Sequence, residues 1–581
     1  MTASRLGLLS RTIVHLSLRQ VAARAQLRGQ RALLSLAPGA APFLLRPPSP
    51  DQVRGWPAGY LPLDGRAISS WPRRVEIEAG RIRLLGIERG LKQPGDWMRP
   101  EVPQLWRYHL HYWDWAWGLV ADADRAISRQ VFARLWQSWR SATTIGKADA
   151  WHPYPASLRA WSWCGQFEYL VRGSDIEDDF VSDLAWHAGF VRRFLERDVA
   201  GNHLLKNLKA VIGLALFLGD EQQLRQFVRR MVSQVGVQVL PDGGHYERAP
   251  AYHCQVLADL TDVVELLQTA GRTPPEELER AISRMRGWLR STVLPDGTVP
   301  LVNDGFPVEP GLLAAMGNTV PSQPDPRTPL HILADTGLVR ATAGDWQVLA
   351  DVGDPCPLEL PAHAHADSLS CIVNFRGQPL LIDTGTSTYA AGPVRDYERS
   401  TAAHNTVEID DADSTEVWGA FRAARRARIK GRAACVTPAG VVIAAAHDGY
   451  RALPGRPVHH RRWLVTGDRI EVEDRVTGRG SHRMAVRWHL APGLRARVTD
   501  SGADVSVPDG LVSFMVTSSA AATLSIETNR AATGFGCTTA VQTLICRLEA
   551  QLPVAVTTSW CGFASNAALS AAELVPAEET R

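Results

Sequence analysis

The periodicity of the apolar residues changes once along the chain, and this change constrains the fold more than any single motif. Over residues 105–293, apolar residues recur at helical spacing in about eight successive segments joined by short loops. This helical signal stops over 330–343. Over 346–560, short apolar runs alternate with Gly, Pro and Asp, which is typical of antiparallel strands. The sequence therefore predicts a multidomain α+β chain, an array of helical hairpins followed by an antiparallel β-sandwich.

We place the domain boundaries at the changes of pattern, which gives an N-terminal arm over 1–100, a helical domain over 101–335 and a sandwich domain over 336–581. Residues 1–34 carry arginines among apolar residues at helical spacing, so they predict a basic amphipathic helix. Such a helix lies on a membrane, on another protein or on its own domain, and the sequence leaves these alternatives open. No secretory signal peptide is recognised there. No run of about 18 apolar residues, the length that would span a bilayer, occurs in the chain.

The charges of the chain nearly cancel, with 63 basic and 60 acidic residues among 581. These totals show no electrostatic footprint for a nucleic acid, so we expect no nucleic-acid partner. The eight cysteines are scattered without a C-x-x-C pair. This spacing argues against a thiolate metal site and against a disulfide framework.

The segment 361–410 holds the densest set of chemically capable side chains. Its residues His363, His365 and Asp367 alternate, which on an extended strand would point all three side chains to one face. Two short apolar runs within 371–382, separated by Arg-Gly-Gln-Pro, then indicate a hairpin. We therefore expect this segment to form the centre of a functional site.

Two later residues of the segment add metal-ligand chemistry. Asp383 ends the second run of the hairpin, and His404 precedes a further strand-like pattern, TVEID. His365, Asp383 and His404 could therefore meet at three neighbouring strand ends. Two imidazoles, a carboxylate and a water suit zinc, and Asp367 is a spare carboxylate that could orient a histidine. The alternative is that the histidines are hydrogen-bonded core or loop residues. The loop before His404 also carries Tyr389, Arg395, Tyr397 and Arg399.

Two stretches of the helical half are not explained by packing alone. The first, GNHLLKN over 201–207, begins a helix, for which Asn202 is the simplest N-cap. The second, PDGGHYERAPAYH over 241–253, contains turn-forming Asp-Gly-Gly and Ala-Pro breaks. It is predicted to be a loop at one end of the helical array that presents Tyr246, Glu247, Arg248, Tyr252 and His253.

Tryptophan is concentrated in the helical half, where twelve of nineteen lie over 97–288. Flat aromatic faces suit sugar rings, and Trp106, Trp113, Trp151 and Trp161 sit beside polar residues as a carbohydrate groove would require. Core packing is the competing interpretation for each of them.

Six motifs, taken in order, resemble those of the heparinase II/III family of polysaccharide lyases. They are WHPYPASLRAWSW, NHLLKN, DGGHYERAPAYH, HAHADSLS, LIDTGT and RSTAAHNTVEID. The resemblance covers residues 106–409 in motifs and continues in the strand pattern beyond. It implies an incomplete (α/α) toroid followed by an antiparallel β-sandwich, and cleavage of uronic-acid-containing polysaccharides by β-elimination. The N-terminal arm is similar to that of members encoded with bacterial exopolysaccharide synthesis.

The resemblance also implies roles for single residues. Asn202 matches the amide that binds the uronate carboxyl group, with Asn207 in reserve, and Tyr252 and His363 match the proton-transfer pair. Tyr246 competes with Tyr252 for its role. The zinc site of part of the family, expected here as one structural zinc per chain, falls on His365, Asp383 and His404. Further substrate contacts are expected from Trp106, Trp161, His203, Tyr246, Glu247, Arg248 and Arg399.

The partner implied by the resemblance is an acidic polysaccharide, and the implied location is the periplasm or cell envelope. Because no signal peptide is recognised, a cytoplasmic location stays open, and the N-terminal helix could contact a membrane peripherally.

One rival function is a zinc-dependent hydrolase, since His-x-His-x-Asp also occurs in enzymes that activate a zinc-bound water. No alternating strand and helix series of a β/α barrel follows the motif here. The other rival is a non-catalytic glycan-binding or assembly protein, which would not require the proton-transfer pair.

Overall fold

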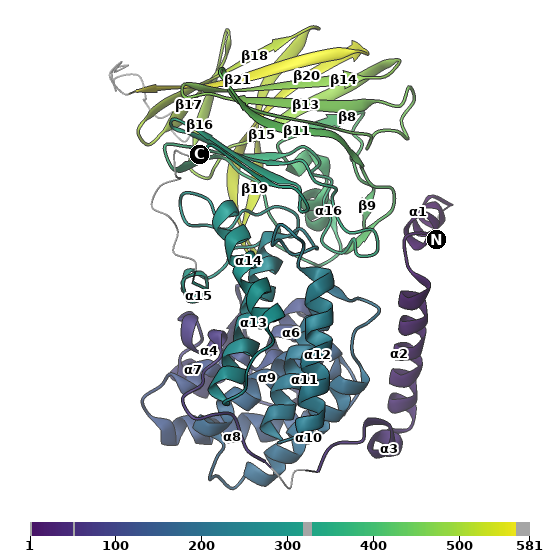
Figure 1. Ribbon diagram of the computed structural model, residues 1–581, viewed down its shortest axis with the longest axis vertical. Helices are drawn as coiled ribbons and strands as arrows, with labels where there is room; N and C mark the ends of the chain where they lie inside the picture. The colour runs from purple at the N-terminus through teal and green to yellow at the C-terminus, as the bar shows by residue number, and fades with distance from the viewer. Residues whose placement is uncertain (1–2, 50–52, 318–327, 565–581) are drawn as a thin grey trace, which may run out of the picture.

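The computed structural model describes residues 3–49, 53–317 and 328–564. A helical domain and a sheet domain lie end to end, and the N-terminal arm runs along one side of the molecule (Figure 1). The fold is an incomplete (α/α) toroid followed by an antiparallel β-sandwich, which confirms the predicted fold class. None of the described helices is both long and apolar enough to cross a membrane.

Long helices in antiparallel pairs build the toroid. Helices that lie inside the array are buried over most of their surface because neighbours cover them. The outer helices are amphipathic and capped, as by Asp124 and Asp220. Among the inner helices, α11 packs against both α9 and α13. The long helices are α6 (Gln104–Tyr112), α8 (Arg125–Ala142), α9 (Pro153–Leu170), α10 (Glu177–Arg193), α11 (Gly201–Phe217), α12 (Glu221–Gln238), α13 (Pro250–Thr269) and α14 (Glu276–Thr292).

Shorter elements surround the toroid and the arm. The arm begins with α1 (Ala3–Ile13) and α2 (Leu18–Leu36). A two-stranded hairpin, β1 (Arg81–Leu84) and β2 (Ile87–Gly90), packs beside α6. The remaining short helices are α3 (Ala41–Leu45), α4 (Leu63–Ala67), α5 (Arg74–Glu78), α7 (Trp117–Val120), α15 (Pro310–Ala315) and α16 (Pro393–Arg399).

Three antiparallel sheets form the second domain. A five-stranded sheet runs in chain order through β3 (Leu330–Leu333), β4 (Leu338–Ala343), β5 (Trp346–Asp351), β6 (Cys371–Phe375) and β7 (Gln378–Leu381). A four-stranded sheet has the order β19 (Ala522–Gly534), β20 (Cys537–Gln551), β15 (Ser481–His489) and β8 (Val407–Ile409). A sheet of eight strands has the order β11 (Ile429–Thr437), β12 (Gly440–His447), β13 (Val458–Val465), β14 (Arg469–Thr477), β21 (Val554–Ala564), β18 (Gly510–Ser518), β17 (Gly502–Val507) and β16 (Arg495–Thr499). A two-stranded ribbon of β9 (Val417–Trp418) and β10 (Arg422–Ala423) completes it.

Two local predictions about the site segments are wrong. Residues 361–370 are loop and turn, so His363, His365 and Asp367 do not alternate along a strand. Helix α11 begins at Gly201 with Ala200 in the cap position, so Asn202 lies inside the first turn and is not its N-cap. The expected hairpin over 371–382 is present as β6 and β7.

Candidate active site

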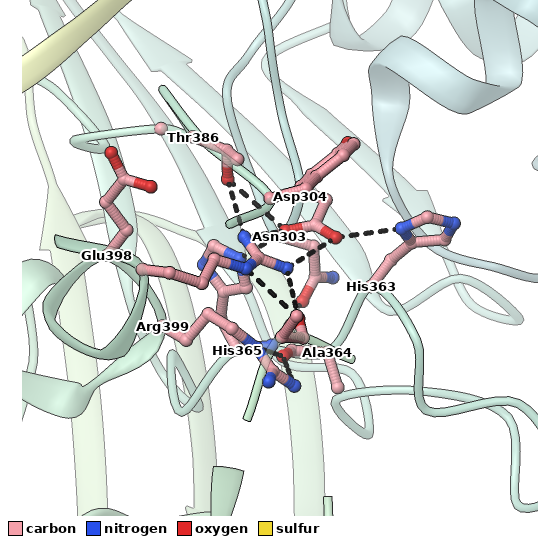
Figure 2. A network of polar contacts seen from close by, with 12 residues as sticks. Asn303, Asp304, His363, Ala364, His365, Thr386, Glu398 and Arg399 are labelled. Carbon is pink, nitrogen blue, oxygen red and sulfur yellow. Dashed lines mark hydrogen bonds and ion pairs between the residues drawn. The ribbon is translucent and has the colours of Figure 1, made fainter. Parts of the chain in front are cut away.

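Asp304 lies at the centre of a buried polar network where the two domains meet (Figure 2). Its Oδ2 is 2.9 Å from Nδ1 of His363, and its Oδ1 is 2.9 Å from Nε2 of His365. The guanidinium of Arg395 donates to both carboxylate oxygens. The Thr386 hydroxyl donates to Oδ1 at 3.3 Å. One carboxylate thereby positions both histidines of the His-x-His motif and pairs a fully buried arginine.

The loop that carries Asp304 follows α14 and is held by its neighbour Asn303. The Asn303 side chain accepts a hydrogen bond from the His365 backbone N–H at 3.0 Å and donates one to the Arg248 carbonyl at 3.0 Å. Asn303 has a positive φ of 57°, a conformation that asparagine tolerates better than most residues. Sequence reasoning missed Asn303 and Asp304, because the only local signal is an Asn-Asp-Gly turn.

Tyr252 and His363 stack on each other across the domain junction. Their ring centroids are 3.9 Å apart, and Tyr252 lies in the first turn of α13. The Tyr252 hydroxyl is 2.7 Å from the hydroxyl of Tyr389, which comes from the loop before α16. Tyr389 in turn packs edge-on against Phe421 and Phe535. The two tyrosine hydroxyls therefore form a hydrogen-bonded pair beside the imidazole.

Glu247 connects Asn202 to His363. Its two carboxylate oxygens accept hydrogen bonds from the backbone N–H and the side-chain amide of Asn202, both at 2.8 Å. Nε2 of His363 is 3.3 Å from Glu247 Oε2. A Cβ at Gly201 would lie 1.8 Å from Glu247 Oε1, so only glycine allows this approach. Because a carboxylate only accepts, the amide nitrogen of Asn202 must face Glu247, and its Oδ1 is buried without a partner.

The electrostatics of the site follow from this geometry. Burial by itself lowers the pKa of His363, but its hydrogen bonds to Asp304 and Glu247 outweigh burial and raise the pKa to about 9. Burial by itself raises the pKa of Glu247, but the hydrogen bond to His363 and the nearby imidazoles lower the pKa to about 2. Burial raises the pKa of Tyr252 well above its ordinary value. At neutral pH the site holds an imidazolium between two carboxylates, next to a neutral phenol.

The predicted metal ligands lie beyond Asp304, deeper in the sheet domain. The rings of His365 and His404 have centroids 5.3 Å apart. Asp383 accepts a hydrogen bond from Nδ1 of His404 at 2.9 Å and another from the Gly385 backbone at 3.0 Å. Asp383 therefore orients His404 in this structure, the role that the sequence had suggested for Asp367.

The donor set around these histidines fits zinc in its chemistry. Nδ1 of His365, Nε2 of His404 and both carboxylate oxygens of Asp367 are buried without hydrogen-bond partners. Such orphaned atoms are costly unless a ligand satisfies them. These side chains do not converge on one point, however. Among the described residues, no group of three or more His, Cys, Asp or Glu side chains is arranged to hold a metal ion.

Three of the expected substrate contacts lie at the edge of this network. Tyr246 and Arg248 flank Glu247 and are half-buried. Arg248 has a positive φ of 60° and donates to the Asp354 carbonyl. His203 is half-buried, and its Nδ1 is 3.0 Å from Glu196 Oε1. These side chains retain the exposure that a substrate contact needs.

Of the other four, Glu247 is buried between Asn202 and His363, and the remaining three do not face a groove. Trp106 is buried and donates to the Ile87 carbonyl, and Trp161 packs against Trp56 with ring centroids 4.5 Å apart. Arg399 is buried and donates to the carbonyls of Ala364, Gly419 and Arg422, so it holds the loop between His363 and His365. Trp113 and Trp151 also lie in the toroid core. Core packing thus accounts for the four tryptophans, whose positions beside polar residues did not indicate exposure.

Comparison with known proteins identifies the same architecture. The family model for the heparinase II/III N-terminus matches residues 92–324, and that for the heparinase II/III-like C-terminal domain matches residues 325–561. The crystal structure of heparinase III superposes with a TM-score of 0.72 at 15% identity, covering 92% of this chain and 91% of that chain. At this identity the likeness is one of fold.

Two curated proteins are similar in sequence. FtsZ-localized protein C of Caulobacter vibrioides is 28% identical over 489 residues, which cover 79% of this chain and 81% of that protein. Heparin-sulfate lyase of Bacteroides stercoris is 22% identical over 372 residues, which cover 54% of this chain and 55% of that protein.

Proposed function

The chain belongs to the heparinase II/III family of polysaccharide lyases, and on this premise we propose that it cleaves uronic-acid-containing glycans by β-elimination. The observation that carries the proposal is the continuous set of contacts joining Asn202, His363 and Tyr252 through Glu247. These residues are far apart in sequence and come from both domains. A packing role alone gives no reason for an amide, an imidazole and a phenol to meet at the domain junction.

Asn202 is proposed to neutralise the substrate carboxyl group. The C5 proton of a uronate is weakly acidic because the neighbouring carboxylate is already negative. The side-chain amide of Asn202, which donates to Glu247 at 2.8 Å in this structure, is proposed to donate instead to the uronate carboxylate when substrate binds. That interaction stabilises the enolate-like intermediate in the manner of an oxyanion site.

Tyr252 and His363 are proposed to move the two protons. His363 takes the proton from C5 in its neutral form, in which Asp304 holds the Nδ1–H at 2.9 Å and Nε2 is free to accept. The C4–O4 bond breaks as the C4=C5 double bond forms, and the neutral phenol of Tyr252 protonates the departing O4. Tyr389, hydrogen-bonded to Tyr252 at 2.7 Å, stabilises the phenolate until Tyr252 regains a proton from water and His363 releases the C5 proton to water.

The reaction class is tested by product analysis on a panel of soluble uronate polymers, including bacterial exopolysaccharides. We expect shorter chains whose new non-reducing ends carry a conjugated double bond, detected by ultraviolet absorbance and mass spectrometry. New ends that carry hydroxyl groups in place of the double bond would show that the reaction is hydrolysis and not elimination. As a control, Asn202→Ala should lower turnover by about 10²- to 10³-fold, because the intermediate loses its stabilising amide.

We also propose that His365 and His404 hold one structural zinc per chain, with Asp383 as the predicted carboxylate ligand and Asp367 as the competing one. The orphaned nitrogens of the two histidines support this assignment. Zinc would supply a fixed positive charge that braces the loop carrying His363. We assign it no part in the proton transfers.

Metal analysis of the purified protein tests the zinc proposal. We expect about one zinc per chain in the native protein and its loss in His365→Ala, because two histidine ligands and a carboxylate are the minimum set here. Asp383→Asn and Asp367→Asn distinguish the two carboxylates by which of them lowers the zinc content. Equal zinc content in the native protein and in both His365→Ala and His404→Ala would end the proposal.

A second candidate function is a non-catalytic glycan-binding or assembly protein of the cell envelope. It is favoured by the similarity to FtsZ-localized protein C, which extends over more of the chain than the similarity to the curated lyase. The near closure of the site also favours it, since His363 and Tyr252 are only 7% and 8% exposed. Glycan binding without any chain shortening across the panel would support this candidate. In either case we propose a location in the periplasm or envelope and a link to exopolysaccharide metabolism.

A further inference from the structure

The outward face of helix α2 is apolar. Leu18 and Leu36, one at each end of the helix, are 88% and 85% exposed, and Val21 and Leu33 between them are about half exposed. These positions fall on one side of a helical wheel, together with Ala22, Ala25, Gly29 and Ala32, which are also exposed. A helix of a globular protein normally turns such a stripe toward its core. Here the stripe faces away from both domains.

Exposed apolar residues are concentrated in this arm. Among the described residues, eight of the nineteen large apolar side chains that are exposed lie within the first 43 positions. Besides the four on α2, they are Leu6, Ile13, Val14 and Phe43. A concentration of exposed apolar residues in one segment marks an interaction site rather than ordinary surface.

The same arm is strongly basic. Residues 1–50 contain seven arginines and no lysine, aspartate or glutamate. Because the whole chain has a formal charge of only +3, the remainder is net negative. Arg19 and Arg28 lie at the borders of the apolar stripe, are exposed, and form no ion pair within the described part of the chain. Apolar side chains bordered by unpaired arginines complement a bilayer whose headgroups are anionic.

The inner face of the arm is anchored to both domains, so the outward face is held in place. Arg24 pairs with Asp198 of the toroid at 3.2 Å, and Gln20 donates to the Glu359 carbonyl at 3.1 Å. Arg11 of α1 pairs with Glu416 of the sheet domain at 2.9 Å. Figure 1 shows α2 as an upright column at the outer edge of the molecule, with α1 beside the sheet domain.

We propose that the outward face of α2, with the exposed apolar residues of α1 and Phe43, is a peripheral membrane-docking surface for anionic lipid bilayers. The helix lies in the plane of the interface, buries Leu18, Val21, Leu33 and Leu36 among the acyl chains, and places Arg19 and Arg28 against the headgroups. The inner anchors of α2, Asp198 and the Glu359 carbonyl, lie in the segments that lead to Asn202 and His363. The proposal does not depend on the lyase activity.

Vesicle sedimentation with the full-length protein tests this surface. We expect binding to vesicles of phosphatidylcholine mixed with phosphatidylglycerol, weaker binding to phosphatidylcholine alone, and release by raised salt because the arginine contribution is screened. Leu18→Asp combined with Leu36→Asp should weaken binding by at least about tenfold, since each leucine contributes through buried apolar area. Arg19→Glu combined with Arg28→Glu should remove the preference for the anionic lipid.

Val237→Asp on the toroid helix α12 is the matched control, because Val237 is an exposed apolar residue that lies outside the arm. It should bind vesicles like the native protein.

No vesicle binding by the native protein, or unchanged binding by the Leu18 and Leu36 double variant, would overturn the proposal. A native dimer in solution that the double variant converts to monomer, without vesicle binding, would assign the face to a second copy of the chain. The cleavage of soluble polymer by the double variant should equal that of the native protein, so failure here is distinct from failure of the lyase proposal.

Discussion

Replacement of Tyr252 by phenylalanine is expected to preserve the fold and substrate binding while lowering kcat by about 10²- to 10⁴-fold, the range for a general acid or base. The substitution removes one hydroxyl, leaves the ring stacked on His363 at 3.9 Å, and breaks only the 2.7 Å hydrogen bond to Tyr389. The measurement is steady-state kinetics by formation of the unsaturated product, with circular dichroism to confirm folding.

Two other tyrosines serve as matched variants. Tyr389→Phe also removes the hydroxyl pair, but it leaves Tyr252 in place, so we expect a smaller loss of kcat than for Tyr252→Phe. Tyr246→Phe should leave kcat near the native value and act mainly on KM. If Tyr252→Phe keeps nearly full activity and Tyr246→Phe loses it, the proton-transfer role belongs to Tyr246.

Replacement of Asp304 by alanine is expected to destabilise the protein by about 3–5 kcal/mol, the cost of leaving a buried charge without its partner. The charge is that of Arg395, whose side chain is fully buried and makes its ion pair with Asp304. His363 and His365 lose the same acceptor, so the geometry of the candidate active site should be lost together with stability. Urea denaturation followed by tryptophan fluorescence measures the change in the free energy of unfolding.

The comparison for Asp304 is an ion pair at the surface. Glu527→Ala breaks the exposed pair with Arg547 and should cost at most about 1 kcal/mol. Asp304→Asn retains one acceptor oxygen and provides a milder variant if the alanine variant does not fold. Equal urea midpoints for the native protein, Asp304→Asn and Asp304→Ala would show that the network does not stabilise the domain junction.

The candidate catalytic residues show how much of the site can be predicted from local sequence. The motifs containing Asn202, Tyr252 and His363 could be singled out from the sequence because each concentrates polar side chains in an otherwise apolar or turn-rich stretch. The resemblance to a known family then suggested their roles. What the motifs could not give is the order of contact, in which Glu247 connects Asn202 with His363 and Tyr389 meets Tyr252.

The sequence by itself determined that the chain has a helical half and a sheet half. The spacing of apolar residues is a local property, with a period of about 3.6 residues in a helix and 2 in a strand, so it can be read without the tertiary structure. The sequence also determined that the arm is basic and amphipathic. Only the tertiary structure decided which face of α2 is outward and that Trp106 and Trp161 are core residues, because a period does not say what covers a face. Only the tertiary structure revealed Asp304, a single carboxylate in an aperiodic loop. Its importance arises from His363, His365 and Arg395, which lie 59 to 91 positions away in the chain and become its neighbours only when the two domains pack together.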